Sequence, residues 1–588
     1  MLGLFLAASV AGCVSVPGGG PVLSYTITQG PDGQSQPYPQ VIAQAPRAGW
    51  LPEEIVRGFL TASASFGARQ QQIAREYLTA KEDRAWTPGW SAIVYSNGPN
   101  VQSAVYSGTS RNRQATVTIG GSVQATLSTS GGYAVPSASS GSAPGKSLTF
   151  RLQQVGGQWR ISQAPPYLLL TSYAFQYDYQ LRNLYFFDPT GSFLVPDPVY
   201  VPLQATTANL MEGLVNDLIH PPTDWLSRGA TNSAFPRRTT TIGDITLDGG
   251  TAAIDFGGGI TKGASDSLLQ KVSAQLLWTL TGSGQSGPAV QSVEVSVNGK
   301  AWSPPGSDLN PVQQLHQSRY SPPTGASSQF YYVDGSGNLL ASDGPQGKPV
   351  KVSHIGTGYS QIAVSPDRQY LAALSNGSLF IGRVGGPLVK RDGTGYTSMS
   401  WDPGDDLWAT SGGQIVMLRG TANPDQTQGK PVAVNVVSSD GISENAGPFS
   451  ALRVAPDGVR VAIIGGAADL SFGAIVSQPG PRPGVAAIEI VLSPFSVSVP
   501  GATFTAVTWY GPDNVITLRD PGPELTEYPV NGGSSTSIPP QERMSWITAS
   551  FGSPLIAGLP RGAMVADASL SGSWMPLAGT GVSAVYPG

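Results

Sequence analysis

The sequence predicts a multidomain protein in which two α+β domains precede an all-β propeller of about six blades. The chain has 588 residues, which is too long for a single hydrophobic core. Helix-period and strand-period segments alternate through the first half, whereas the second half consists of short strands separated by Gly, Pro, Asp and Asn. We expect a leader at 1–12, a flexible tether at 13–46, α+β domains at 47–170 and 180–302, and a propeller at 320–588.

The first α+β domain is predicted to begin with two helices. Pro52, Glu53 and Glu54 suit a first helical turn, and apolar residues follow them at helical spacing up to Leu60. A second helix is expected around Ile73–Leu78. After Trp90 the apolar period changes to two, and Gly156-Gly157 indicates a tight hairpin. Helices that lead into a curved antiparallel sheet suggest an α+β domain, for which a cystatin-like fold is one candidate.

The second α+β domain is predicted to have the order β-β-α-β-β-α-β. Tyr185–Pro196 forms a strand, a turn and a strand, and Thr206 or Thr207 can cap the helix that follows. That helix must end at His220-Pro221-Pro222, because proline cannot continue it. Two strands, a helix over 268–280 and a strand over 293–297 complete the unit.

The propeller is predicted from a repeat in which an apolar strand meets a Pro-Asp or Pro-Gly turn and reverses into a second apolar strand. The copies lie at Ile362–Asp367, Met399–Gly404, Leu452–Gly458 and Val507–Asp513. Val582–Pro587 resembles an inner strand without outer strands, and Phe330–Leu340 resembles outer strands without an inner one. Pairing these two ends would close the ring and leave no free sheet edge.

Cys13, the single cysteine, predicts a lipid anchor. The residues before it are small or apolar, Val10-Ala11-Gly12-Cys13 fits a bacterial lipobox, and the sequence after it turns abruptly to Gly, Pro and Ser. We expect cleavage after Gly12, N-acylation and S-diacylglycerol modification of Cys13, and a location on the outer face of the cytoplasmic membrane. Met1–Leu6 lacks the usual basic residues of such leaders. The alternative is a buried cysteine in a short core helix.

Composition argues against several other functions. Charged residues make up 12% of the chain and the formal net charge is −4, which disfavours nucleic-acid binding. Apart from the leader, the sequence has no apolar run near the roughly 20 residues of a spanning helix. A single cysteine excludes an intramolecular disulfide, and once it is acylated it leaves no thiol for catalysis.

The titratable residues do not predict a reaction or a metal site. His220, His316 and His354 lack zinc-ligand spacing, and His220 is expected to cap a helix. Gly257–Gly259 lacks the lysine of a P-loop and is interpreted as an ordinary loop. We therefore predict no catalytic, cofactor-binding or metal-binding residue and no cofactor. Three acids without calcium-loop spacing are expected in turns or on a solvated strand face: Asp244, Asp248 and Asp255.

The order of these segments resembles the actinobacterial LpqB lipoprotein family. Ile55–Leu60 and Ala74–Thr79 resemble its N-terminal domain, while Phe187–Pro202 and the helix beginning at Asn209 resemble a GerMN domain. The resemblance implies an accessory lipoprotein that binds the extracytoplasmic part of the sensor kinase MtrB and modulates MtrA/MtrB signalling in cell-envelope homeostasis and division. The family brings no catalytic residues.

Two other interpretations stay open at this point. The chain could be a cell-wall glycan-binding module or an envelope hydrolase with its site in the propeller or in the N-terminal concavity, since two acids of a hydrolase are brought together only in space. It could also be a structural spacer. The leading interpretation is a non-catalytic, membrane-anchored interaction protein.

Overall fold

A computed structural model gives the fold. The residues that it describes are 43–64, 68–87, 91–109, 112–135, 147–203, 207–281, 290–305, 312–314, 318–419, 431–438, 448–466, 468–479, 486–533, 535–541 and 543–588. The predicted leader, the cleavage site after Gly12, the lipidation site Cys13 and most of the tether lie outside these residues, as do Thr206 and His316. The multidomain class predicted from the sequence, with an α+β region before a β-propeller, is confirmed.

The chain forms two compact units, which we describe separately. The first unit comprises residues up to Trp86, Val101–Thr118 and Thr149–Ala164. Its helices are α1 (Pro52–Ala64), α2 (Ala68–Glu76) and α3 (Ala80–Ala85), and its sheet runs β2-β4-β7-β8 with β3 on β4. The strands are β2 (Asn100–Val101), β3 (Val105–Thr109), β4 (Asn112–Gly120), β7 (Leu148–Val155) and β8 (Gln158–Gln163).

Helix α1 lies on this sheet through the apolar face that its sequence predicts. Ile55, Val56 and Phe59 are buried, and the Phe59 ring lies 5.9 Å from that of Phe150 on β7 in an edge-on arrangement. The predicted hairpin is also confirmed, because β7 and β8 pair antiparallel around Gly156 and Gly157, which have φ angles of 59° and 80°. Only glycine adopts two such angles in succession at little cost.

The second unit contains residues 87–100, 119–148 and 165–588, and it starts with a four-stranded sheet in the order β6-β5-β1-β9. These strands are β1 (Ala92–Tyr95), β5 (Val123–Leu127), β6 (Tyr133–Ala134) and β9 (Leu168–Thr171). The expectation of a purely antiparallel sheet is wrong, because β1 and β9 run parallel. The long connection between them, which includes β7 and β8, permits this arrangement. An unpredicted helix, α4 (Ser172–Asp178), follows β9 and is capped by the Thr171 hydroxyl.

A middle region follows with the predicted order of strands and helices and several additions. The hairpin of β10 (Tyr179–Phe187) and β11 (Leu194–Pro202) is closed by Asp188, whose carboxylate accepts hydrogen bonds from the amides of Thr190, Ser192 and Phe193. The remaining elements are α5 (Thr207–Leu218), α6 (Asp224–Ser227), β12 (Thr246–Asp248), β13 (Thr251–Phe256), the 3₁₀ helix η1 (Gly258–Ile260), α7 (Asp266–Thr281), β14 (Ser292–Val297), β15 (Lys300–Trp302) and β16 (Val312–Gln314).

Helices α5 and α7 supply the core of the middle region. Leu210, Leu214 and Leu218 recur at helical spacing on α5 and share a buried cluster with Leu276 and Leu280 of α7. This cluster also contains apolar residues of β10, β13 and β14, so the helices cover the hairpin and the sheet β12-β13-β14-β15.

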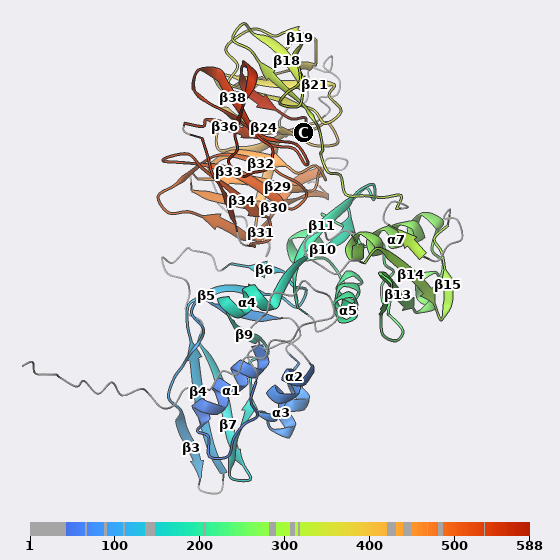
Figure 1. Cartoon of the computed structure of the whole chain (residues 1–588), viewed down its shortest axis with the longest axis vertical. Helices are drawn as coiled ribbons and strands as arrows, with labels where there is room; N and C mark the ends of the chain where they lie inside the picture. Colours follow the sequence, from blue (N-terminus) through green and yellow to red (C-terminus); the bar gives the residue numbers. More distant parts are fainter. Residues whose placement is uncertain are drawn as a thin grey trace, which may run out of the picture. The chain divides into compact units, whose positions relative to one another are not determined.

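The C-terminal part of the second unit is the β-propeller, drawn in yellow to red in Figure 1. Among its described residues the strands form four sheets of four strands and one of eight, with the orders β19-β18-β17-β40, β20-β21-β22-β23, β24-β25-β26-β27-β31-β30-β29-β28, β32-β33-β34-β35 and β36-β37-β38-β39. The strands are β17 (Gln329–Val333), β18 (Asn338–Asp343), β19 (Val350–His354), β20 (Gln361–Val364), β21 (Tyr370–Ser375), β22 (Ser378–Arg383), β23 (Val389–Lys390), β24 (Tyr396–Trp401), β25 (Leu407–Ser411), β26 (Gln414–Leu418), β27 (Val432–Val437), β28 (Phe449–Val454), β29 (Arg460–Gly465), β30 (Asp469–Pro479), β31 (Ala486–Ser498), β32 (Thr503–Trp509), β33 (Asn514–Asp520), β34 (Glu524–Pro529), β35 (Thr536–Ile538), β36 (Trp546–Thr548), β37 (Leu555–Gly558), β38 (Ala563–Asp567), β39 (Met575–Thr580) and β40 (Val582–Val585).

The predicted pairing of the two ends of the propeller is confirmed. Tyr331 of β17 is paired with Val585 of β40 in antiparallel register, so the last strand completes the sheet of the first. A second pairing was not predicted: β27 and β31 run parallel, with Val434 opposite Ile488, and they join two neighbouring sheets into the eight-stranded one. In the described part of the chain, no helix has both the length and the apolar character needed to cross a membrane.

Candidate functional site

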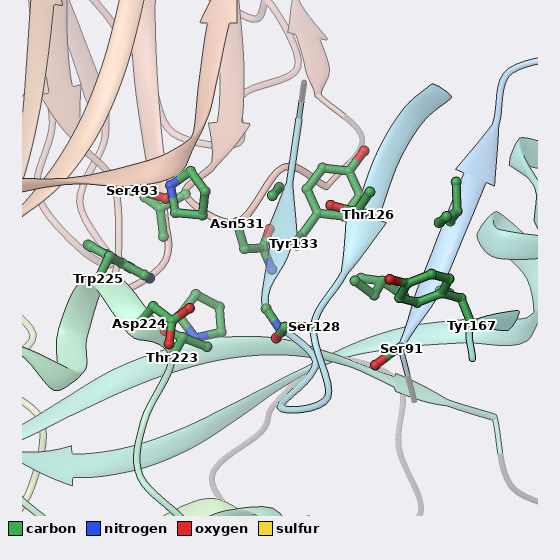
Figure 2. Close-up of a pocket in the computed structure, with 18 residues that line it drawn as sticks. Ser91, Thr126, Ser128, Tyr133, Tyr167, Thr223, Asp224, Trp225, Ser493 and Asn531 are labelled. Carbon is green, nitrogen blue, oxygen red and sulfur yellow. The ribbon is translucent and has the colours of Figure 1, made fainter. Parts of the chain in front are cut away.

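Three parts of the second unit meet around a cavity of about 380 Å³, shown in Figure 2. The four-stranded sheet contributes residues of β1, β5 and β6, the middle region contributes Pro198 and Thr223–Trp225, and the propeller contributes Ser493, Pro494, Val530 and Asn531. In the view of Figure 2, Trp225 lies on one side of the cavity, and Thr126 and Tyr167 lie on the other. The cavity therefore depends on segments that are far apart in the sequence.

Tyr133, which lines the cavity, belongs to an aromatic cluster. The Tyr133 ring of β6 lies 5.7 Å from that of Phe175, 5.3 Å from that of Tyr200 and 6.3 Å from that of Phe495 in the propeller. Gly532 approaches Tyr133 so closely that a Cβ atom there would lie 2.5 Å from the ring. The absence of a side chain at Gly532 is thus a condition for this contact.

A buried carboxylate holds Thr223, another residue that lines the cavity. Asp197 of β11 is fully buried, and its two oxygens accept 2.7 Å hydrogen bonds from the amide and the hydroxyl of Thr223. Burial raises the pKa of Asp197 to about 6, while the hydrogen bonds from Thr223 act in the opposite direction. Thr223 directly precedes α6, so this pair of bonds fixes the start of the helix and with it Asp224 at the cavity.

Helix α6 also packs against the propeller. Trp225 and Leu226 share a buried cluster with Val476 of β30 and with Val437 and Val491, which belong to the paired strands β27 and β31. The unpredicted pairing of β27 with β31 therefore places apolar side chains of two propeller sheets in one cluster with a helix of the middle region.

A hydrogen-bonded ionic network forms a further link between the middle region and the propeller. Asn183 of β10 donates to Asp513, whose other carboxylate oxygen lies 3.5 Å from Nη1 of Arg460. Nε of Arg460 also donates to Asp457 at 2.6 Å, and the guanidinium group lies 5.5 Å from the centre of the Trp509 ring. Both acids thus face a single buried arginine.

The residues lining the cavity can bind a ligand or a partner side chain by hydrogen bonding and packing. Asp224 is the one charged residue among them, and its neighbours offer hydroxyl groups and apolar surface. The lining residues include no histidine, cysteine or lysine that could act with Asp224 as a nucleophile or a base. The groups present are suited to hydrogen bonding and to packing against a bound group.

The histidines and acids that the sequence analysis weighed as possible ligands do not line this cavity. Nδ1 of His220 lies 2.5 Å from the Asn216 carbonyl oxygen at the end of α5, as expected for a capping residue. His354 is exposed on β19 and contacts Asn338. The Asp255 carboxylate accepts hydrogen bonds from the amide of Gly299. Among the described residues no three acids, histidines or cysteines are grouped so that they could hold a metal ion.

The loop Gly257–Gly259 also has a local role. Gly258 begins the 3₁₀ helix η1, and its amide donates to the side chain of Asn298. Asp244 and Asp248 are exposed, in agreement with their expected places in turns or on a solvated face. None of these residues lines the cavity around Asp224.

The sequence analysis did not single out Asp197 or Thr223. A signal was present, because Asp197 is the one charged residue in β11, whose other residues are apolar or proline except for Tyr200. A charge in such a strand requires a buried partner. The sequence could not identify Thr223 as that partner, because the two residues meet only after α5 has folded between them.

Comparison with known proteins follows the same division of the chain. Residues 45–176 match the model of "Lipoprotein LpqB, N-terminal domain", residues 183–302 match "Sporulation and spore germination", and residues 337–587 match "Lipoprotein LpqB beta-propeller domain". Proteins named Lipoprotein LpqB match over nearly their whole length. That of Thermobifida fusca is 28% identical over 99% of this chain and 97% of its own, and that of Streptomyces avermitilis is 29% identical over the same shares.

The chain belongs to the LpqB lipoprotein family. The Mycobacterium bovis LpqB is 26% identical and covers 100% of this chain and 98% of its own. The predicted family resemblance is therefore confirmed. The cavity in this LpqB family member lies where segments matched by all three family models come together.

Proposed function

We propose that this LpqB family member is a non-catalytic lipoprotein, held on the outer face of the cytoplasmic membrane through Cys13, that binds the extracytoplasmic domain of an MtrB-like sensor kinase. Binding would modulate MtrA/MtrB two-component signalling in cell-envelope homeostasis and division. The observation that carries the proposal is the match to LpqB proteins over nearly the full chain.

The packing within the second unit supports a binding role. The apolar cluster around Leu226 and the bond from Asn183 to Asp513 join the middle region to the propeller. A unit that is organised before binding loses less conformational freedom when a partner docks. The two domains are therefore suited to present one composite surface to the kinase.

The cavity at Asp224 is the position on this surface where we place the kinase contact. Its hydroxyl groups and its single carboxylate suit a protruding hydroxylated or basic side chain. Such a contact would contribute mainly through a few desolvated side chains.

Binding can be tested with the mature chain carrying Cys13→Ser and the purified kinase ectodomain from the same organism, by surface plasmon resonance. We expect saturable binding. A lack of binding both in this assay and in crosslinking on intact membranes would refute the kinase interaction.

Matched variants then test the position of the contact. Asp224→Arg reverses the charge at the cavity, whereas Asp244→Arg makes the same change at an exposed residue that does not line it. We expect Asp224→Arg to weaken binding at least tenfold and Asp244→Arg to leave it unchanged. Equal effects of the two variants would exclude the cavity as the contact while leaving the kinase interaction itself supported.

A further inference from the structure

Two adjoining cavities lie at the propeller, the smaller one also lined by Phe193 of the middle region, and neither shares a lining residue with the cavity at Asp224. One has a volume of about 520 Å³ and the other about 230 Å³, and Arg453, Thr508, Thr548 and Val585 line both. The larger cavity is rich in hydroxyl groups from the inner strands of successive sheets and from Ser360, which directly precedes β20. Those on the strands include Thr397, Ser398, Ser450, Thr505 and Ser583. The two cavities therefore meet at Arg453.

Arg453 uses only one edge of its guanidinium group to contact the protein. Nη1 donates to Oγ of Ser398 at 2.9 Å, to the carbonyl oxygen of Leu452 at 2.7 Å and to that of Met399 at 3.2 Å. Nε and Nη2 have no hydrogen-bond partner among the residues that the structure describes. These two nitrogens form the side-on edge that binds a carboxylate with two parallel hydrogen bonds.

No acidic side chain lines either cavity, and the smaller one is also lined by Gly588, which carries the terminal carboxylate of this chain. Arg453 is the one charged side chain among the residues that line them. Burial lowers the pKa of Arg453 to about 10, which leaves the group charged at neutral pH. Arg453 is partly buried, whereas the nearby Arg460 is fully buried and is paired with Asp457 and Asp513. An arginine without such a partner is unusual, because a desolvated charge is costly when it is unpaired.

The repeat pattern shows that the fold itself does not require an arginine here. Arg453 stands between Leu452 and Val454 in the inner strand of its repeat, three residues before the turn proline. The equivalent residue is Ser400 in the preceding repeat and Thr508 in the following one. Ser400 lines the smaller cavity, and Thr508 lines both. The propeller thus accepts a small hydroxylated side chain at this position.

We propose that Arg453 binds the carboxylate of a small hydroxylated acid, of the sugar-acid class, inside the propeller. The free Nε and Nη2 would hold the carboxylate, and the surrounding serine and threonine hydroxyls would hold the hydroxyl groups of the ligand. A single positive charge selects a monoanion. This site goes beyond kinase binding and does not depend on it.

Isothermal titration calorimetry of the full mature chain with D-glucuronate tests the site, with D-glucose as the uncharged control. We expect D-glucuronate to bind and D-glucose not to bind. Arg453→Gln should weaken glucuronate binding at least tenfold. Arg453→Lys should retain part of the affinity, because the charge stays while the two-pronged edge is lost. Lys390→Gln, which removes an exposed charge on β23, should leave binding unchanged. Undiminished binding to a folded Arg453→Gln protein would overturn the proposal.

A measurement on the unaltered protein covers the case in which the variants fail to fold. Phenylglyoxal modifies accessible arginines, and peptide mass spectrometry gives the extent of modification at Arg453. We expect D-glucuronate to slow this modification at Arg453 and not at exposed Arg228. Equal protection of both arginines, or none at Arg453, would contradict the site. Protection of Arg453 by acetate as strong as that by glucuronate would contradict the sugar-acid assignment. None of these outcomes bears on kinase binding.

Discussion

The Asn183 side chain of the middle region donates a hydrogen bond to the Asp513 carboxylate of the propeller. Asp513 also faces Arg460, whose Nε donates to Asp457. Burial raises the pKa of Asp513, and the charge of Arg460 acts in the opposite direction. The network therefore connects the packing of two domains to the protonation of one carboxylate.

Loss of this hydrogen bond should destabilise the second unit. Asn183→Ala leaves one oxygen of the partly buried Asp513 carboxylate without its donor, which costs about 1–3 kcal/mol. Urea unfolding followed by tryptophan fluorescence measures the change in the free energy of unfolding. Asn435→Ala, at an exposed position on β27, serves as the control and should change stability by less than about 0.5 kcal/mol. Equal effects of the two variants would show that the hydrogen bond from Asn183 to Asp513 does not contribute to stability.

A second buried acid predicts that stability depends on pH. Burial, followed by the charge of Asp197, raises the pKa of Asp217 from 3.8 to about 7, and one of its carboxylate oxygens is buried without a hydrogen bond. Between about pH 4 and about pH 7 the folded state binds more protons than the unfolded state. The free energy of unfolding therefore falls as the pH rises through this range. One titrating carboxyl group changes the free energy of unfolding by at most about 1.4 kcal/mol for each pH unit.

Asp217→Asn should remove most of that slope and raise stability at pH 7.5. Asp197 also makes stability fall as the pH rises, but only up to about pH 6. A weaker pH dependence of stability therefore remains in the Asp217→Asn variant. Melting temperatures between pH 4 and pH 8 measure the effect, and Asp248→Asn at an exposed position is the control. An unchanged slope in Asp217→Asn would rule out this carboxyl group as its source.

The contact of α6 with the propeller should be sensitive to truncation. Leu226 is fully buried beside Val476 and Val491, and removal of its side chain leaves a cavity there. Leu226→Ala should cost about 2–5 kcal/mol, whereas Arg228→Ala, two residues further at an exposed position, should be near neutral. Chemical denaturation compares the two. A small effect of Leu226→Ala would mean that the cluster relaxes around the gap.

The predicted lipid anchor has a direct test. Cys13→Ser removes the acceptor of the diacylglycerol group, and burial of acyl chains contributes about 0.8 kcal/mol per methylene group. Fractionation of cells should find the variant in the soluble extracytoplasmic fraction and the unaltered protein in membranes. Retention of the variant in membranes washed with high salt would argue against anchoring through Cys13.

The fold class could be predicted because local patterns determine it. The residues Leu210, Leu214 and Leu218 repeat at helical spacing, and the helix that they form ends before Pro221. The Pro-Asp turns also have their expected local role at Asp367, whose carboxylate accepts from the amide of Gln369. In each case the residues that interact are close in the sequence.

The cavity and the links around it could not be predicted in the same way. Asp513 belongs to the same turn motif as Asp367, yet its partners are Asn183 and Arg460, which are distant in the sequence. The parallel pairing of β27 with β31 likewise depends on two strands from different repeats. A single sequence does not specify which of several similar strands or acids will meet.

The closing pair of the propeller sets a constraint on how the protein is made. Tyr331 and Val585 stand near opposite ends of the propeller sequence, so the ring cannot close until almost the whole propeller has been synthesised. Until then β17 has an unpaired edge, which is a site for aggregation. Contacts over such a sequence distance form slowly, and loss of the last few residues of the propeller would leave the ring open.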